Sequence, residues 1–102
     1  RVVGRVWLGI VVYVRRFIEG SDAIAGGNNS DDGLGGAGWS SEIDRADDVS
    51  NQMKSGMVWI NKHAELDPCL ACGGAKQAEL GDELGMVGLK EFTQLKMINM
   101  AR

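Results

Sequence analysis

The sequence has little of several features that would point directly to a function class. Lys and Arg number 11 against 14 Asp and Glu, giving a net charge of −3, so there is no cation excess to attract nucleic acid or an anionic membrane. The longest apolar run, residues 6–14, is far shorter than the ~20 residues that span a bilayer, and no small-residue cleavage site follows it. We therefore expect no nucleic-acid partner, no membrane association and no signal peptide.

Cysteine is also scarce, with two residues in 102, and no secretory signal is recognisable. This combination favours a reducing, cytoplasmic compartment. The rest of the composition is ordinary for a globular chain, since 44% of the residues are hydrophobic and 25% are charged. At this length we expect a single domain covering residues 1–102, with a modest core.

Hydrophobic patterning predicts strands alternating with helices. Residues 6–14 are rich in Val, Ile, Trp and Tyr without polar alternation, which is typical of a strand covered on both faces. The complete expectation is a small, three-layer-like α/β unit in the order β-α-β-α-β-loop-α-β, with a mostly parallel sheet and right-handed crossovers. The predicted strands are residues 6–14, 34–39, 57–60 and 97–100, the predicted helices are residues 19–25, 41–53 and about 80–92, and residues 61–78 are a loop.

Local signals place some of these boundaries. Ser41 suits a helix N-cap, with Asp44 three residues further on in the capping-box position. The run Gly26-Gly27-Asn28-Asn29 is expected to end the first helix, and the glycines of residues 33–38 are expected to weaken the second strand. We expect Trp7, Trp39 and Trp59 to anchor the core, and the acidic residues Glu42, Asp44, Asp47 and Asp48 to form a solvated helix face.

Three motifs in the second half carry a family resemblance. They are Gly-Met-Val-Trp-Ile-Asn at residues 56–61, Gly-Gly-Ala-Lys-Gln at residues 73–77 and Leu-Lys-Glu-Phe-Thr-Gln-Leu-Lys at residues 89–96, with Gly85 between the last two. Their order resembles the C-terminal part of the catalytic domain in the NAD(P)-dependent aldehyde dehydrogenases, which read GTVWIN, PFGGxKxSGxGRELG and GLxEYTxxK. The resemblance implies oxidation of an aldehyde to an acid with hydride transfer to NAD or NADP.

The chain departs from the family at chemically important positions. Where the family's E-x-F-G-P-V motif has a general base and a ribose-contacting phenylalanine, this chain has Arg1 and Val3, and a guanidinium accepts no proton at neutral pH. Ala71-Cys72 replaces Pro-Phe, and Asp82 replaces an arginine. The resemblance places the catalytic cysteine, the oxyanion asparagine and the dinucleotide-binding half upstream of this sequence. We therefore assign no catalytic or cofactor-binding residue and expect no cofactor to bind the chain in isolation.

A metal site is the next candidate. Cys69 and Cys72 form a CxxC, and His63 precedes them, so a fourth ligand would have to come from Glu65 or Asp67. Structural zinc sites commonly use two such pairs, and we assign no metal ligand. A thioredoxin-like role is disfavoured too, because Gly73-Gly74 indicates a turn where redox enzymes begin a helix.

Two further motifs are weak. The glycines at residues 33–38 invite a phosphate-loop interpretation, but no Lys-Ser or Lys-Thr follows them. His63 as a catalytic base has no nucleophile beside it in sequence, and a lone histidine in a loop is more often a hydrogen-bonding residue.

Three hypotheses of different class follow. The first is a truncated or divergent aldehyde dehydrogenase segment that is not catalytic by itself and whose partner is the missing remainder of the enzyme. The second is a stand-alone interaction or oligomerisation module, and the third is a small Cys/His metal-binding domain. In the family the chain's closing segment runs toward a neighbouring subunit, so residues 97–100 predict a homo-oligomer.

Overall fold

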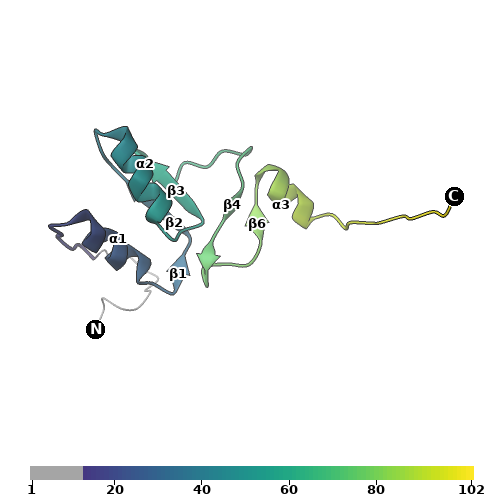
Figure 1. Ribbon diagram of the computed structural model, residues 1–102, viewed down its shortest axis with the longest axis horizontal. Helices are drawn as coiled ribbons and strands as arrows, with labels where there is room; N and C mark the ends of the chain where they lie inside the picture. The colour runs from purple at the N-terminus through teal and green to yellow at the C-terminus, as the bar shows by residue number, and fades with distance from the viewer. Residues whose placement is uncertain (1–12) are drawn as a thin grey trace.

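The computed structural model describes residues 13–102 as a mixed α/β arrangement (Figure 1). The predicted first strand falls mainly on residues 1–12, outside the described part, and its last residues, Tyr13 and Val14, are exposed and belong to no helix or strand. The elements are α1 (Gly20–Asn28), β1 (Asp32–Gly33), β2 (Gly35–Gly38), α2 (Ile43–Gln52), β3 (Met57–Ile60), β4 (Cys72–Gly73), β5 (Ala75–Lys76), β6 (Asp82–Glu83) and α3 (Gly85–Glu91).

The strands form three separate pairs instead of one sheet. Among the described residues, β2 and β3 run parallel, whereas β1 pairs with β5 and β4 pairs with β6 in antiparallel fashion. The prediction of a mostly parallel sheet is therefore wrong, and so is the prediction that residues 61–78 are only loop. The antiparallel pairs contain two residues per strand, too short to leave the alternating pattern by which strands are recognised in sequence.

The parallel pair is built on glycine. In its register Gly35 lies opposite Met57 and Ala37 opposite Trp59. A Cβ added at Gly35 would lie 2.7 Å from the Trp59 ring, and one at Gly36 would collide with the end of Met53. The glycines that weaken β2 as a strand therefore let a tryptophan and a methionine lie directly on its backbone.

Helix α1 ends inside the run of residues 26–29 that was expected to end it. It continues through Gly26 and Gly27 to Asn28, three residues past the predicted end at residue 25, and tertiary contacts hold this end of the helix. The Asn28 side chain donates to the Gln52 carbonyl at 2.8 Å and accepts from the Lys54 amide at 2.7 Å. A glycine costs a helix about 1 kcal/mol relative to alanine, which two such hydrogen bonds can offset.

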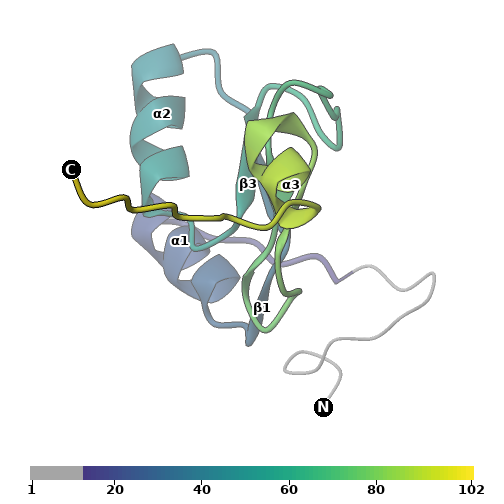
Figure 2. The same cartoon turned by 90° about the vertical axis from the view of Figure 1, so that its right-hand side faces the viewer.

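Helix α2 forms within two residues of the predicted range. It begins at Ile43, after an N-cap position filled by Glu42, so Ser41 is not the N-cap. Instead, Ser40 Oγ accepts the Glu42 amide at 3.0 Å. Ala46 on the inner face is buried, whereas the acidic face is exposed, as expected: Glu42, Asp44, Asp47 and Asp48. In Figures 1 and 2, α1 and α2 lie on the same side of β2 and β3.

The last helix is shorter than predicted. Leu84 and Gly85 have φ values of 60° and 55°, so the chain turns sharply after β6 and α3 starts only at Gly85. Residues 97–100 form no strand and lie along the extended tail in Figure 1, so the predicted closing strand is wrong. Of the helices in residues 13–102, none combines the length and apolar character needed to cross a bilayer.

Backbone segments cross closely at three glycines. The Gly56 amide donates to the Gly33 carbonyl at 2.9 Å, and a Cβ at Gly56 would collide with the Gly73 carbonyl oxygen. Gly33 is equally confined, since its Cβ would meet the Lys54 and Ala75 carbonyl oxygens. Only glycine, which has no side chain, permits this approach. It brings the turn between α2 and β3 into contact with β1 on one side and with β4 on the other.

The core is thin. Within residues 13–102 the only buried hydrophobic residue is Ala46, and it is still 7% exposed. Trp59 is half-buried, but Trp39 is 66% exposed, so its predicted role as a core anchor is wrong, and Trp7 lies outside the described residues. The radius of gyration is 17.8 Å, against about 13 Å for a compact chain of this length.

The close approach of the backbone at Gly56 to the Gly73 carbonyl leads to a prediction about stability. Gly56→Ala should lower the free energy of unfolding by about 2 kcal/mol or more, because the new methyl group overlaps a backbone carbonyl that has no room to move. Gly27→Ala is the matched control, since a Cβ there meets nothing within 4 Å and the helix gains about 1 kcal/mol. Urea unfolding followed by circular dichroism measures both, and equal midpoints for the two variants would contradict the crossing.

Candidate functional site

The carboxyl ends of β2 and β3 form the best-defined polar arrangement. In α/β structures this end of parallel strands is where ligands commonly bind. The Asn61 amide donates to the Gly38 carbonyl at 2.8 Å, which extends the ladder past β3. The Asn61 side chain then bonds both backbone groups of Ser40, accepting from its amide at 2.9 Å and donating to its carbonyl at 3.0 Å. Asn61 has a φ of 57°, a conformation that asparagine tolerates better than most residues.

An aromatic cluster lies beside this bridge. The His63 ring is 5.6 Å from the Trp59 ring, edge to face, and 6.4 Å from the Trp39 ring. Trp59 Nε1 donates to the Glu65 carbonyl at 2.8 Å, which draws the loop after β3 back over the strand end. His63 therefore lies close to two tryptophan rings, an environment that its position in the sequence did not reveal. We call Trp39, Trp59, Asn61 and His63 the strand-end cluster.

The residues weighed as candidate metal ligands do not come together. No group of three or more His, Cys, Asp or Glu side chains in residues 13–102 is placed to hold a metal ion. Both cysteines are reduced, with Cys69 exposed and Cys72 half-buried. Asp67 instead accepts the Cys69 amide through Oδ1 at 2.8 Å, and Glu65 is engaged with Trp59 through its carbonyl. The Asp67 carboxylate and the Glu65 backbone carbonyl thus both take part in hydrogen bonds that shape the loop.

The glycine run at residues 33–38 pairs with and packs against other segments of the chain, so it does not form an open loop. Gly33 belongs to β1 and lies against Ala75 and the Lys54 carbonyl, and residues 35–38 are β2. The next helix starts only at Ile43, so no helix N-terminus follows the glycines directly. A phosphate loop needs free amides at a helix start, and this segment is structural, as expected.

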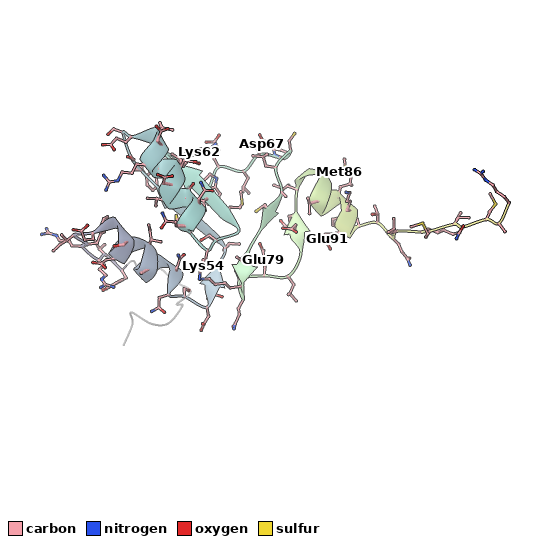
Figure 3. The ribbon with its side chains drawn as sticks, in the orientation of Figure 1. Lys54, Lys62, Asp67, Glu79, Met86 and Glu91 are labelled. Carbon is pink, nitrogen blue, oxygen red and sulfur yellow. The ribbon has the colours of Figure 1, made fainter. Side chains whose placement is uncertain are left out.

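Lys76 makes a contact that the sequence did not indicate. Its Nζ donates to the Asn28 carbonyl at 2.9 Å and to the Ser30 carbonyl at 2.8 Å, across 48 and 46 residues of sequence. Because Asn28 also bonds the end of α2 and the Lys54 amide, Lys76 completes a clamp joining α1, α2 and β5. Figure 3 shows Lys54 near β1, where these segments meet. The only sequence signal was the presence of Lys76 in the Gly-Gly-Ala-Lys motif.

A groove of about 630 Å³ lies between α1, α2 and the β2–β3 pair. Its wall is mainly apolar, with Ile24 from α1, Val49 from α2, Met53 directly after α2, and Val58 from β3. Arg45 is the only charged residue of the described chain that lines it. The groove marks a face of the strand pair that the described residues cover only partly.

The clamp gives a testable prediction. Lys76→Met should lower the free energy of unfolding by about 1–2 kcal/mol, because two carbonyl groups lose a charged donor. Lys62→Met is the control, since Lys62 pairs with Glu65 at 3.6 Å on the surface and such pairs contribute about 0.5 kcal/mol. Urea unfolding compares the variants, and an equal loss in both would show that Lys76 is not a clamp.

Comparison with known proteins gives a consistent result. The family model described as "Aldehyde dehydrogenase family" matches residues 7–98. The chain is similar to the succinate-semialdehyde dehydrogenase [NADP(+)] of Deinococcus radiodurans, at 41% identity over 90 residues that cover 88% of this chain and 19% of that protein. It is also similar to the betaine aldehyde dehydrogenase of Bacillus subtilis, at 35% identity over 98 residues, or 96% of this chain and 20% of that one.

Solved structures agree with the sequence comparisons. A betaine aldehyde dehydrogenase from Staphylococcus aureus superposes with a TM-score of 0.79 at 42% identity, covering 82% of this chain and 17% of that one. The same enzyme in complex with NAD+ gives a TM-score of 0.72 at 41% identity, covering 74% and 15%. The chain thus spans about a fifth of the length of the curated relatives it matches. With a family match over residues 7–98 and the same fold in these enzymes, the chain belongs to the aldehyde dehydrogenase family.

Proposed function

We propose that this chain serves as the C-terminal part of an aldehyde dehydrogenase catalytic domain and that it is not catalytic by itself. The family oxidises aldehydes to acids with NAD(P), and the chain's relatives carry names of such enzymes. In this proposal the catalytic cysteine and the dinucleotide site belong to other parts of the enzyme. The loop after β3 then forms a wall beside the substrate.

The observation that carries this proposal is the amount of apolar surface left open. A chain that folded as a self-sufficient domain would bury most of its large hydrophobic side chains, at roughly 25 cal/mol per Å². Here Leu80 is fully exposed, Phe92 is 90% exposed and Leu95 is 89% exposed. Together with the match to a fifth of each relative, this supports a segment that packs against further protein.

The position of the cysteines also supports a non-catalytic role for the isolated chain. Cys69 is exposed on a loop, and Cys72 starts a two-residue strand. The residue that the resemblance aligns with the family's general base, Arg1, lies outside the described residues, but its guanidinium accepts no proton. We therefore assign neither the nucleophile nor the general base of the family's reaction to Cys69, Cys72 or Arg1.

A chimera tests the proposal. This chain replaces the matching 98 residues of the Bacillus subtilis betaine aldehyde dehydrogenase, with and without Arg1→Glu, and NAD(P) reduction with betaine aldehyde is followed by absorbance. We expect the isolated chain to be inactive and the chimera to be weakly active. Arg1→Glu should raise turnover by about 100-fold or more, because it restores a general base.

The controls separate folding from chemistry. The chimera's oligomeric state and its affinity for NAD are measured first, so that an inactive but folded chimera can be recognised. Aldehyde oxidation by the isolated chain, lost on Cys69→Ser or Cys72→Ser, would overturn the proposal. So would a folded Arg1→Glu chimera that shows no turnover.

We propose association as a second function of the same chain. After Thr93 the chain is extended and forms no strand, and its apolar side chains have little cover: Met97 is 84% exposed, Ile98 72% and Met100 82%. An unpaired extended segment presents backbone donors and acceptors along with these side chains. Pairing with a second copy would bury both, so a homo-oligomer is the simplest outcome.

Light scattering tests association. The intact chain should be oligomeric, most simply a dimer, and a version ending at Leu95 should have a lower mass because it lacks Met97, Ile98 and Met100. A 102-residue variant with Met97 and Ile98 changed to Ser keeps the length of the chain and removes only the apolar side chains of these two residues. A monomeric intact chain, or an oligomer that both changes leave intact, would contradict this role of the tail.

A further inference from the structure

One pair of nucleophilic side chains has no part in the strand-end cluster or the lysine clamp. Cys69 and Cys72 are separated by two residues and both carry free thiols. The resemblance aligns Ala71-Cys72 with the Pro-Phe of the family motif, so the second cysteine is a departure from that motif. A buried structural cysteine would be inert, but Cys69 is exposed and Cys72 only half-buried.

The backbone holds both ends of this pair. Asp67 begins a tight turn in which the Leu70 amide donates to the Asp67 carbonyl at 3.0 Å and the Cys69 amide to Asp67 Oδ1 at 2.8 Å. Figure 3 shows Asp67 at the turn that leads into β4. At the other end Cys72 opens β4 and lies opposite Glu83 of β6.

The residues between the thiols belong to no helix or strand, and the Leu70 side chain is 61% exposed. Their backbone lies against Gly85, where an added Cβ would be 2.9 Å from the Ala71 amide nitrogen and 3.0 Å from the Cys69 carbonyl oxygen. Bringing the two sulfurs together therefore displaces no buried side chain, but it shifts these peptide groups relative to the Gly85 backbone. Only two residues lie between the thiols, so ring closure costs little chain entropy compared with capture of a second molecule from solution.

We propose that Cys69 and Cys72 form a site of redox modification that closes to an intramolecular disulfide with a small-molecule disulfide such as oxidised glutathione. The Cys69 thiolate attacks one sulfur of the oxidant and releases one glutathione thiolate. The Cys72 thiolate then attacks Cys69 Sγ in the mixed disulfide and releases the second. The two protons lost by the cysteines go to the released thiolates, and the two electrons reduce the oxidant.

The exposures set the order of the two steps. Cys69 meets the solvent first and is the attacking group, whereas the half-buried Cys72 acts as the resolving thiol. No helix begins after Cys69, so the pair lacks the helix N-terminus that makes dedicated oxidoreductases reactive. The disulfide would fix the entry to β4, next to the Pro68 carbonyl that accepts the Gly85 amide at 3.0 Å.

Mass spectrometry tests the proposal without reference to enzyme activity. The full chain is equilibrated at graded ratios of reduced to oxidised glutathione, quenched with acid and analysed intact and after digestion. We expect its mass to fall by two hydrogen atoms, with one peptide that contains the bond between Cys69 and Cys72. Cys72→Ser should instead accumulate a glutathione adduct on Cys69, several-fold faster than Cys69→Ser acquires one on Cys72.

Three outcomes would overturn the inference. These are a wild-type chain that stays reduced where glutathione itself is oxidised, one that keeps a stable glutathione adduct, and one that links two chains through sulfur. Faster adduct formation on Cys72 than on Cys69 would overturn the order of attack. Because no outcome depends on aldehyde oxidation, the result is independent of the proposed catalytic context.

Discussion

The arrangement depends on the close approach of the backbone at Gly56 to the backbone at Gly73 and Gly74. The Gly56 amide is bonded to the Gly33 carbonyl on one side, and on the other side a Cβ would collide with Gly73. Because glycine has no side chain, three segments that are distant in sequence can approach this closely, at a cost in backbone entropy. Lys76 adds to the same junction through its bonds to Asn28 and Ser30, so α1, α2 and the second half of the chain meet there.

This way of joining segments explains the thin core. Glycine and short strand pairs connect backbone to backbone and bury little apolar area, so the hydrophobic contribution to folding is small within the described residues. Ala46 is buried, while large side chains such as Leu80 and Phe92 remain in solvent. Such a unit gains stability by covering those side chains with more protein, and this links its energetics to the context proposed for it.

The residues of the family motifs fall into two groups, those that shape the backbone and those that the resemblance connects with chemistry or substrate. Positions that shape the backbone keep the residue types the family uses, as in Gly56, Asn61 and Lys76, and each has a geometric role here. Positions that the resemblance connects with chemistry or substrate differ, as in Arg1 and Ala71-Cys72. The fold therefore persists where the chemical groups have changed, and at Cys72 the change leaves a dithiol beside a family loop.

Sequence alone determined the family and the elements whose signals are local. The Val-Trp-Ile run of β3 and the helical repeat of Ala46 and Val49 in α2 depend on neighbouring residues, so both were predicted to within two residues. The motif order gave the family for the same reason. At the site, the sequence indicated that Asn61 and Lys76 belong to motifs but not what they bind.

Only the tertiary structure decided the remainder. The end of α1 depends on a bond from Asn28 to Gln52, and β1 exists because Asp32 lies opposite Lys76, contacts that span 24 and 44 residues. The placement of His63 close to both Trp39 and Trp59 likewise requires β2 and β3 to end together. Hydrogen bonds and ring contacts between residues far apart in sequence produce no local periodicity. The structures that depend on these contacts therefore cannot be predicted from local sequence patterns.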